Sequence, residues 1–318
     1  MGIFDYIIFF GALLMLEILY VMIAGRLDIM DRPHHQSSHS GNVVRGGGVI
    51  VFVAFLLWSI MNNFPDKGCM AGLTLLAVVS FADDNHGVSP KIRLVFQFVA
   101  VLLMIYHSEW GMFMPFTILL MAIVFVGTIN ICNFMDGING MIGGYSMVVA
   151  LALVYVNEYH IHFVESSLLV FVIMALLVFD IFNFRKKALC FAGDVGSLSI
   201  GFILTYLLML LSLKVESMSW FGMLIVYGID GGLTILHRFF LRENLLKPHK
   251  KHAYQIMVNE LKMPHLAVSG LYMALQTICC IWLIAIPGYL TLFLQMVILS
   301  IAYLVFMKKY YYLHVRRG

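Results

Sequence analysis

The chain has 318 residues, of which 62% are hydrophobic and only 12% are charged, and its formal net charge is +3. Its mean hydropathy of +0.93 is far above that of a soluble domain of this length, which must keep a polar surface in water. The composition therefore excludes an ordinary soluble domain. The small positive charge fits cytoplasmic loops and anionic lipid headgroups, and it gives no evidence for nucleic acid binding.

About eleven apolar stretches are long enough to cross a hydrocarbon core of about 30 Å as helices, given that ends buried by protein need fewer residues. In chain order they cover residues 3–24, 46–62, 68–82, 92–106, 114–131, 138–156, 164–182, 195–213, 218–236, 266–286 and 288–307. Residues 1–6 contain an aspartate and no basic residue, so we expect a retained first helix and no cleaved signal. The sequence predicts an all-α polytopic membrane protein, with residues 1–318 forming a single domain.

The basic residues indicate the orientation, because cytoplasmic loops retain Lys and Arg. With about eleven spans and the N-terminus outside, all 20 Lys and Arg residues except Lys67 and Lys214 fall on one side. The C-terminus is then cytoplasmic.

Most polar residues of the apolar segments gather at the cytoplasmic helix ends, whereas a transporter more often places such groups at the bilayer midplane. Glu17 is the exception, because it lies inside the first span. We expect it to form an interhelical hydrogen bond, although it is also the best hint of a transporter. Asp180 and Asp230 lie near inner helix ends, and a structural role for Asp180 is as plausible as a functional one.

Asp83 and Asp84 end the third apolar stretch. Two adjacent carboxylates repel each other, which raises one pKa or attracts a cation. The pair is either a base or metal site, or a plain pair of acids at a helix end.

Asn130, Asn133 and Asp136 follow one another at three-residue steps, so on a helix they share a face at the inner end of the fifth span. Oxygen ligands of this kind suit Mg²⁺, which binds through one or two carboxylates and substrate phosphates. The alternative is that the amides cap the helix end.

Asp194 stands between Gly193 and Val195-Gly196, just before the eighth span. Glycine permits close approach of a ligand, and the following helix N-terminus favours a phosphate, unless Asp194 is a simple N-cap. Phe191 could stack on a nucleobase or pack against its neighbours.

The longest cytoplasmic loop contains His249, Lys250 and His252. These side chains form a cationic cluster suited to a diphosphate, or else a solvated basic loop. The further ligands that a zinc site needs are absent from the pattern.

The order and spacing of these motifs resemble the polyprenyl-phosphate N-acetylhexosamine-1-phosphate transferase superfamily over nearly the whole chain. The motifs are Asp31-Arg32-Pro33 leading through Ser37-Ser38-His39 to Arg45-Gly46-Gly47-Gly48, then Asp83-Asp84, then Asn130, Asn133 and Asp136-Gly137, then Gly193-Asp194-Val195-Gly196-Ser197, and lastly the loop with His249 and His252. The loop sequence His-Lys-Lys-His-Ala-Tyr-Gln looks like the branch that starts O-antigen or capsule chains. It departs from the consecutive histidines of the phospho-N-acetylmuramoyl-pentapeptide transferases.

The resemblance also implies a role for each motif. Asp194 and Asn133 would hold Mg²⁺, with Mn²⁺ as the alternative ion, and the Asp83-Asp84 pair would lie beside the lipid phosphate, one of them as its base. The residues implied to bind substrate are Asn130, Asp136 and Phe191 on the uridine side, His249, Lys250 and His252 on the diphosphate or sugar, and Arg45.

The expected reaction moves a HexNAc-1-phosphate, either GlcNAc or a 6-deoxy-HexNAc, from a UDP-sugar to undecaprenyl phosphate and releases UMP. It would start synthesis of a cell-surface polysaccharide, such as the O-antigen of lipopolysaccharide or a capsule. The active site would lie at the cytoplasmic face of a bacterial inner membrane. A homodimer is possible, but the sequence does not determine the oligomeric state. The alternatives are a muramoyl-pentapeptide transferase and, in another class, a transporter or flippase for a phosphorylated metabolite.

Overall fold

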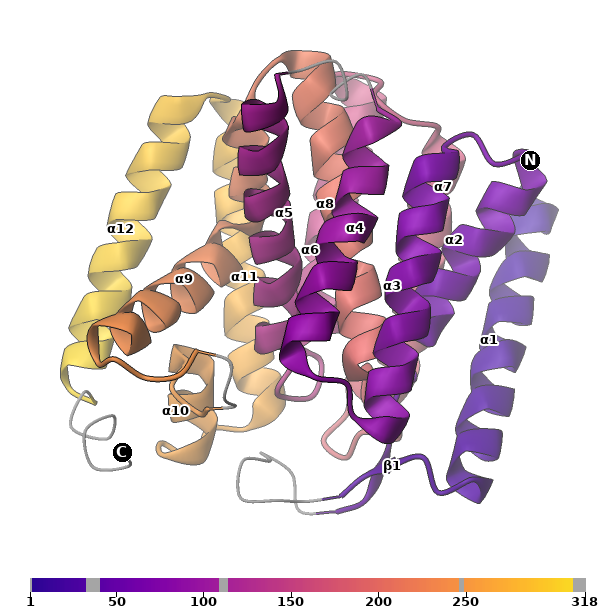
Figure 1. Ribbon diagram of the computed structural model, residues 1–318, viewed down its shortest axis with the longest axis horizontal. Helices are drawn as coiled ribbons and strands as arrows, with labels where there is room; N and C mark the ends of the chain where they lie inside the picture. The colour runs from indigo at the N-terminus through magenta and orange to yellow at the C-terminus, as the bar shows by residue number, and fades with distance from the viewer. Residues whose placement is uncertain (1, 33–40, 109–113, 246–248, 311–318) are drawn as a thin grey trace.

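The computed structural model describes residues 2–32, 41–108, 114–245 and 249–310. In these residues the chain is a bundle of helices with one short two-stranded ribbon at one end (Figure 1). The α-helices are α1 (Ile3–Arg26), α2 (Val49–Met61), α3 (Lys67–His86), α4 (Pro90–Tyr106), α5 (Pro115–Met135), α6 (Met141–Tyr159), α7 (Ser166–Asn183), α8 (Gly193–Val215), α9 (Ile225–Phe240), α10 (Ala253–Asn259), α11 (His265–Ala285) and α12 (Tyr289–Lys308). A 3-10 helix, η2 (Met218–Leu224), precedes α9, and the ribbon pairs β1 (Met30–Asp31) with β2 (Val43–Val44) in antiparallel register.

Each predicted apolar stretch coincides with a helix, and η2 and α9 together form the ninth. Eight helical segments are long and apolar enough to cross a membrane by length and composition. Three of the predicted stretches do not qualify: α2 and α4, with 13 and 17 residues, and α3, which ends in the polar run Asp83-Asp84-Asn85. A mostly helical, polytopic membrane protein is therefore confirmed, while the count of eleven spans and the orientation stay predictions.

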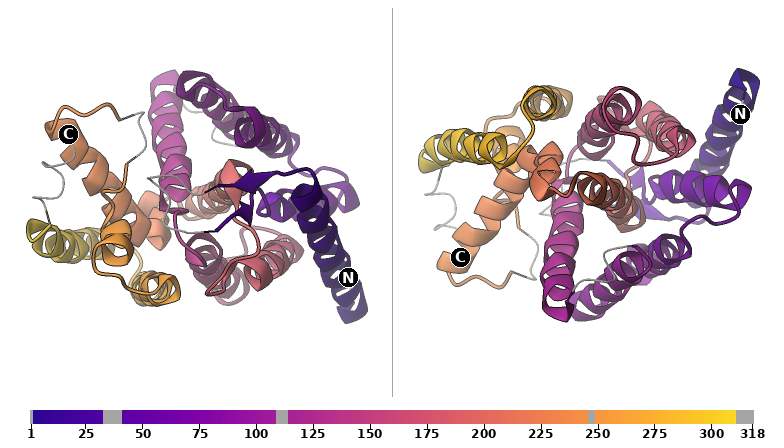
Figure 2. Two further views of the ribbon diagram at one scale, coloured as in Figure 1. Left: turned by 90° about the horizontal axis from the view of Figure 1, so that it is seen from below. Right: turned by 90° about the horizontal axis from the view of Figure 1, so that it is seen from above.

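Helix α8 forms the centre of the bundle. Within its most apolar window 78% of the residues are buried in the protein, compared with 17% for α1 and 22% for α12. It packs against α2, α3 and α5, and the view along the bundle shows it surrounded by other helices, with α1 and α12 at the periphery (Figure 2). A helix that is apolar all round belongs in a core, whereas α1 and α12 leave apolar faces for lipid.

The glycine run after β2 joins the start of α2 tightly to the start of α8. Gly46 has a φ of +85°, which glycine adopts without strain, and the amide N–H groups of Gly47 and Gly48 donate to the carbonyls of Phe191 and Ala192 at 2.9 and 3.2 Å. A side chain on Gly48 would meet the backbone of Gly196 in α8. The run is therefore a structural junction, a role that its sequence did not reveal.

Glu17 is fully buried in α1, and its Oε1 accepts a hydrogen bond of 3.5 Å from Cys190 Sγ. The predicted hydrogen bond is confirmed, but its donor lies in the segment before α8 and not in another helix.

Several helix ends meet at one end of the bundle, the lower end in Figure 1, which we call the site end. Here α3 ends, α4 and α8 begin, and α5 gives way to α6. The short helix α10, which the sequence did not predict, lies there too, beside the oblique helix α9.

Candidate active site

A cluster of three carboxylates and two arginines lies at the site end, where α3, α4 and α8 meet. Arg93, in the first turn of α4, forms ion pairs with Asp83 and with Asp194, the latter with 2.8 Å between Nη1 and Oδ2. Asp83 also accepts a hydrogen bond of 2.6 Å from the Val88 amide in the link between α3 and α4. The structure thus brings together the predicted Asp83-Asp84 pair and Asp194, which are 110 residues apart in sequence, around Arg93.

Asp84 occupies the N-terminus of α8. Its Oδ1 and Oδ2 accept hydrogen bonds of 3.0 Å from the backbone amides of Asp194 and Val195. A carboxylate is stabilised at a helix N-terminus by the unpaired N–H groups and the helix dipole. The place where the sequence suggested a phosphate is therefore taken by Asp84, and Asp194 is a residue of the first turn and not the N-cap.

Arg45 neutralises the other side of the cluster. Its Nε lies 3.5 Å from Asp84 Oδ1, and its Nη2 lies 3.7 Å from Asp31 Oδ1 in β1. The short ribbon thus places Arg45 beside the carboxylates. Of the first sequence motif, Pro33 and Ser37-Ser38-His39 lie outside the described residues.

The α5–α6 link adds further oxygen atoms. Ser197 Oγ donates to Asn133 Oδ1 at 3.0 Å, which ties the end of α5 to the first turn of α8. Burial, together with the negative charges of nearby Asp194 and Asp84, raises the pKa of Asp136 to about 8. The carboxyl groups of Asp84, Asp136 and Asp194 therefore lie close enough to influence one another.

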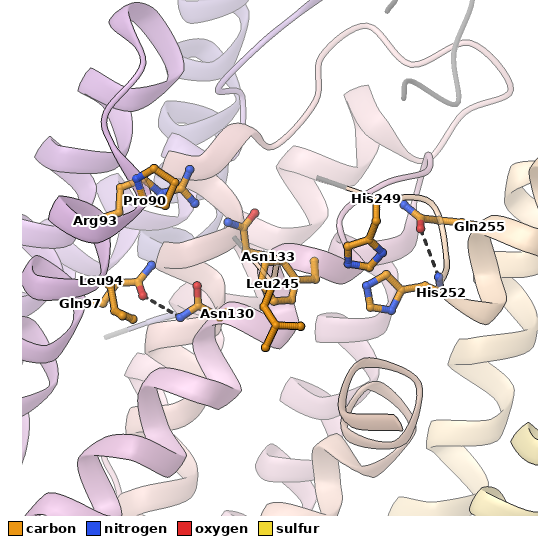
Figure 3. Close-up of a pocket in the computed structure, with 11 residues that line it drawn as sticks. Pro90, Arg93, Leu94, Gln97, Asn130, Asn133, Leu245, His249, His252 and Gln255 are labelled. Carbon is orange, nitrogen blue, oxygen red and sulfur yellow. Dashed lines mark hydrogen bonds between the residues drawn. The ribbon is translucent and has the colours of Figure 1, made fainter. Parts of the chain in front are cut away.

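A cavity of about 310 Å³ opens beside the cluster (Figure 3). Its lining comes from α4, α5, the loop before α10, and α10 itself, and consists of Pro90, Arg93, Leu94, Gln97, Asn130, Asn133, Phe134, Leu245, His249, His252 and Gln255. On its floor Asn130 Nδ2 donates to Gln97 Oε1 at 2.6 Å. The amides of Gln97 and Asn130 thus lie on one side of the cavity and the imidazoles of His249 and His252 on the other, with Leu245 between them (Figure 3).

The histidine loop is fixed to α9 by Glu243. This carboxylate forms ion pairs with Arg238 and with Lys251. Burial acts to raise the pKa of Glu243, but hydrogen bonds from Lys251 and Arg238 outweigh it and hold that pKa below its ordinary value. The rings of His249 and His252 then lie 4.8 Å apart, centroid to centroid, at the edge of the cavity.

The predicted site residues divide between these two features. Asn130, Asn133, His249 and His252 line the cavity, whereas Asp83, Asp84, Asp194 and Arg45 form the adjoining cluster. Phe191, Lys250 and Asp136 are not among the residues that line the cavity. The backbone of Phe191 binds Val44 and Gly47, so its stacking role stays a prediction, as do the roles of Lys250 and Asp136.

Sequence reasoning missed Arg93 and Gln97 as site residues. In the sequence Arg93 is one of the many basic residues that indicate the orientation, and Gln97 lies inside an apolar stretch. Both line the cavity from one face of α4. Their four-residue spacing, with a buried amide in an otherwise apolar helix, is the signal that could have identified them.

The donor set at the cluster fits a Mg²⁺ ion. Asp194 and Asn133 supply carboxylate and amide oxygens at the start of α8, where Arg93 already supplies a positive charge. Among the described ranges no group of three or more His, Cys, Asp or Glu residues is arranged to hold a metal ion. Mg²⁺ often binds through one or two carboxylates together with substrate phosphates, so it does not need such a group.

The model of glycosyl transferase family 4 matches residues 67–212, the stretch from α3 to α8 that contains the carboxylate cluster. A Bacillus subtilis protein named as a probable undecaprenyl-phosphate N-acetylglucosaminyl 1-phosphate transferase is 25% identical over 73% of this chain and 70% of its own length. The Escherichia coli undecaprenyl-phosphate alpha-N-acetylglucosaminyl 1-phosphate transferase is 25% identical over 59% of this chain and 56% of its own.

A phospho-N-acetylmuramoyl-pentapeptide-transferase of Aliarcobacter butzleri is 26% identical over 55% of this chain and 62% of its own length. The chain thus spans less than two thirds of two of these three relatives. The stretch that the family model matches contains Asp83, Asp84, Asn130, Asn133 and Asp194. This chain is thus similar to members of the polyprenyl-phosphate N-acetylhexosamine-1-phosphate transferase superfamily.

Proposed function

We propose that this protein transfers a HexNAc-1-phosphate from a UDP-sugar to undecaprenyl phosphate, giving a lipid diphosphate sugar and UMP. One observation carries the proposal: Arg93 and Asn133 belong both to the cavity and to the carboxylate cluster. Cavity and cluster therefore form one site. The names of the Bacillus and Escherichia relatives support undecaprenyl phosphate as acceptor and a sugar 1-phosphate as the transferred group.

The reaction brings two anions together. An oxygen of the lipid phosphate attacks the β-phosphorus of the donor, a new P–O bond forms, and the bond from the β-phosphorus to the bridging oxygen breaks so that UMP leaves. Positive groups must screen the approaching charges. Arg93 and the loop with His249 and His252 supply them from opposite sides of the cavity.

The two aspartates of the Asp83-Asp84 pair receive different roles. Both oxygens of Asp84 accept hydrogen bonds from α8, so we assign it to holding the first turn of that helix in place. Asp83 instead pairs with Arg93, which lines the cavity, and we assign Asp83 to the lipid phosphate. Mg²⁺ held by Asp194 and Asn133 would neutralise charge on the donor diphosphate.

The setting of the site fits these substrates. A polyprenyl tail lies in the bilayer and a nucleotide sugar arrives from the cytoplasm, so both meet only at the inner helix ends. We therefore place the site end at the cytoplasmic face of a bacterial inner membrane. The histidine loop favours GlcNAc or a 6-deoxy-HexNAc donor over a muramoyl-pentapeptide, and a product that starts an O-antigen or capsule chain.

The test is an assay of purified protein with UDP-GlcNAc, undecaprenyl phosphate and Mg²⁺. UMP release that depends on both substrates is the expected result. Absence of UMP across a panel of UDP-HexNAc donors would overturn the proposal. Turnover with UDP-MurNAc-pentapeptide alone would place the chain in the muramoyl-pentapeptide branch, and flux of a phosphorylated metabolite into liposomes without UMP release would favour a transporter.

A further inference from the structure

His252 is a buried histidine at the wall of the cavity. Only 1% of its surface is exposed, and neither ring nitrogen has a hydrogen bond partner within the parts of the chain that the structure describes. Its Nδ1 lies 3.4 Å from Asp230 Oδ1, at ion-pair distance. No described residue faces Nε2 in this way, and burying a polar nitrogen without a partner is costly. Such a side chain beside a cavity indicates that a ligand completes its contacts.

Asp230 is fixed behind His252 by groups from three helices. Its Oδ1 accepts a hydrogen bond of 2.9 Å from the Ala253 amide at the start of α10. Its Oδ2 accepts one of 2.6 Å from Tyr272 Oη in α11, and Thr234 in α9 donates to Oδ1 at 3.3 Å. The carboxylate is only 3% exposed, so it cannot turn toward solvent. It is therefore a rigid negative group held against the ring.

Aromatic and imidazole rings lie near His252. The neighbouring rings are His249 at 4.8 Å and Tyr254 at 5.7 Å from the His252 ring, and Lys251 next in sequence is paired with Glu243. A carboxylate beside one ring nitrogen of a histidine fixes the orientation and the tautomer of the ring. With Asp230 on Nδ1, the Nε2 across the ring is left as the donor for a ligand oxygen.

We propose that Asp230 is a positioning residue of the transfer reaction, holding the His252 ring so that its Nε2 can donate to the diphosphate of the UDP-sugar. The inference rests on the proposed function. Asp230 at Nδ1 leaves Nε2 as the ring atom that can reach a ligand. A contact of His252 Nε2 with a phosphate oxygen would use the orientation that Asp230 imposes on the ring. Asp230 itself lies behind the ring and touches no substrate in this scheme.

The experiment is a double-mutant cycle on UMP release at saturating UDP-sugar. D230N keeps the size of the side chain and one acceptor for the α10 amides but removes the charge. We expect kcat to fall about 10- to 100-fold with little change in KM for the acceptor lipid, as for other groups that orient a reacting side chain. The kcat of H252N should fall by at least the same factor. The kcat of the double variant should be no more than about threefold below that of H252N, because both substitutions affect the same interaction.

D180N is the matched control, because Asp180 is another carboxylate near an inner helix end that does not line the cavity. It should stay within about threefold of wild-type turnover. Two results would overturn the inference while leaving the proposed function standing. One is a kcat in D230N equal to that of the wild type. The other is a double variant in which the two single-variant decreases in kcat multiply. A wild-type protein that releases no UMP would overturn both.

D230N could fail to give monodisperse protein in detergent. In that case D230E tests the inference, because it keeps the negative charge and lengthens the side chain by one methylene group. Turnover within tenfold of wild type supports the inference, and a loss as large as that of H252N contradicts it.

Discussion

Arg93 Nη1 lies 2.8 Å from Asp194 Oδ2, and the same nitrogen contacts Asp83. One guanidinium thus neutralises two carboxylates that belong to different helices, and it does so at the wall of the cavity. A cation that binds Asp194 must share this carboxylate with Arg93. The charge balance of the site is therefore set by Arg93 together with any metal ion.

Replacing Arg93 separates the contribution of its guanidinium to the charge balance from that of a metal ion. In R93A we expect turnover to fall about 10- to 100-fold, because the screening charge at the cavity is lost. The Mg²⁺ concentration for half-maximal rate should fall, since the competitor for Asp194 is gone. UMP release titrated with Mg²⁺ measures both. K91A is the control, because Lys91 is an exposed residue of the same turn and does not line the cavity. If R93A needs the same Mg²⁺ concentration for half-maximal rate as the wild type, Arg93 and Mg²⁺ do not compete for Asp194.

Asp194→Asn removes the proposed metal-binding carboxylate and keeps its shape. We expect turnover to fall by about 10²–10³-fold, because the charge that holds Mg²⁺ against the diphosphate is gone. EDTA should likewise stop the wild-type reaction, and added Mg²⁺ should restore it. The thermal melting profile in detergent serves as the folding control. A well-folded variant with turnover close to wild type would show that Asp194 does not hold the ion.

The carboxyl group of Asp136 should make the folding stability of the protein depend on pH. Its pKa is about 8 in the folded protein and near 3.8 in an unfolded chain, because burial and nearby carboxylates disfavour its charge. Between these values the folded state keeps a proton that the unfolded state loses, so wild-type stability falls as pH rises from about 4 to about 8. D136N does not titrate. Its melting temperature minus that of wild type should therefore increase across this range and level off above it. A difference that stays constant with pH would contradict the assignment.

Gly48→Ala tests the junction between α2 and α8. The added methyl group would meet the backbone of Gly196 and the side chain of Ala192. We expect a loss of about 1–3 kcal/mol, as for other overpacked sites. Gly228 in α9 is the control, because a methyl there meets nothing within 4 Å. If G48A melts at the same temperature as G228A, the two helices are not in the tight contact described.

The sequence predicted the helices well and the pairing of side chains poorly. Apolar stretches of the right length became helices because nothing else satisfies the backbone in lipid. The order of the motifs indicated that Asp84, Asn133 and Asp194 share one end of the bundle. Which carboxylate meets which partner depends on how α3, α4 and α8 pack, and spacing along the chain carries no such information.

Arg93 and Asp84 illustrate this limit. Arg93 looked like one more basic residue at a cytoplasmic helix end, because hydropathy and charge counting treat all such residues alike. Asp84 looked equivalent to Asp83, yet only Asp84 reaches the amides of α8. The helix α10 was missed as well, since seven residues give too little apolar periodicity to recognise.

The most direct test of the central claim is the mass of the lipid product formed from UDP-GlcNAc and undecaprenyl phosphate. The proposed transfer predicts a product heavier than the acceptor by one HexNAc and one phosphate group, with UMP as the released nucleotide. A product heavier by the sugar alone, with UDP released, would show that only the sugar moves and would contradict the account.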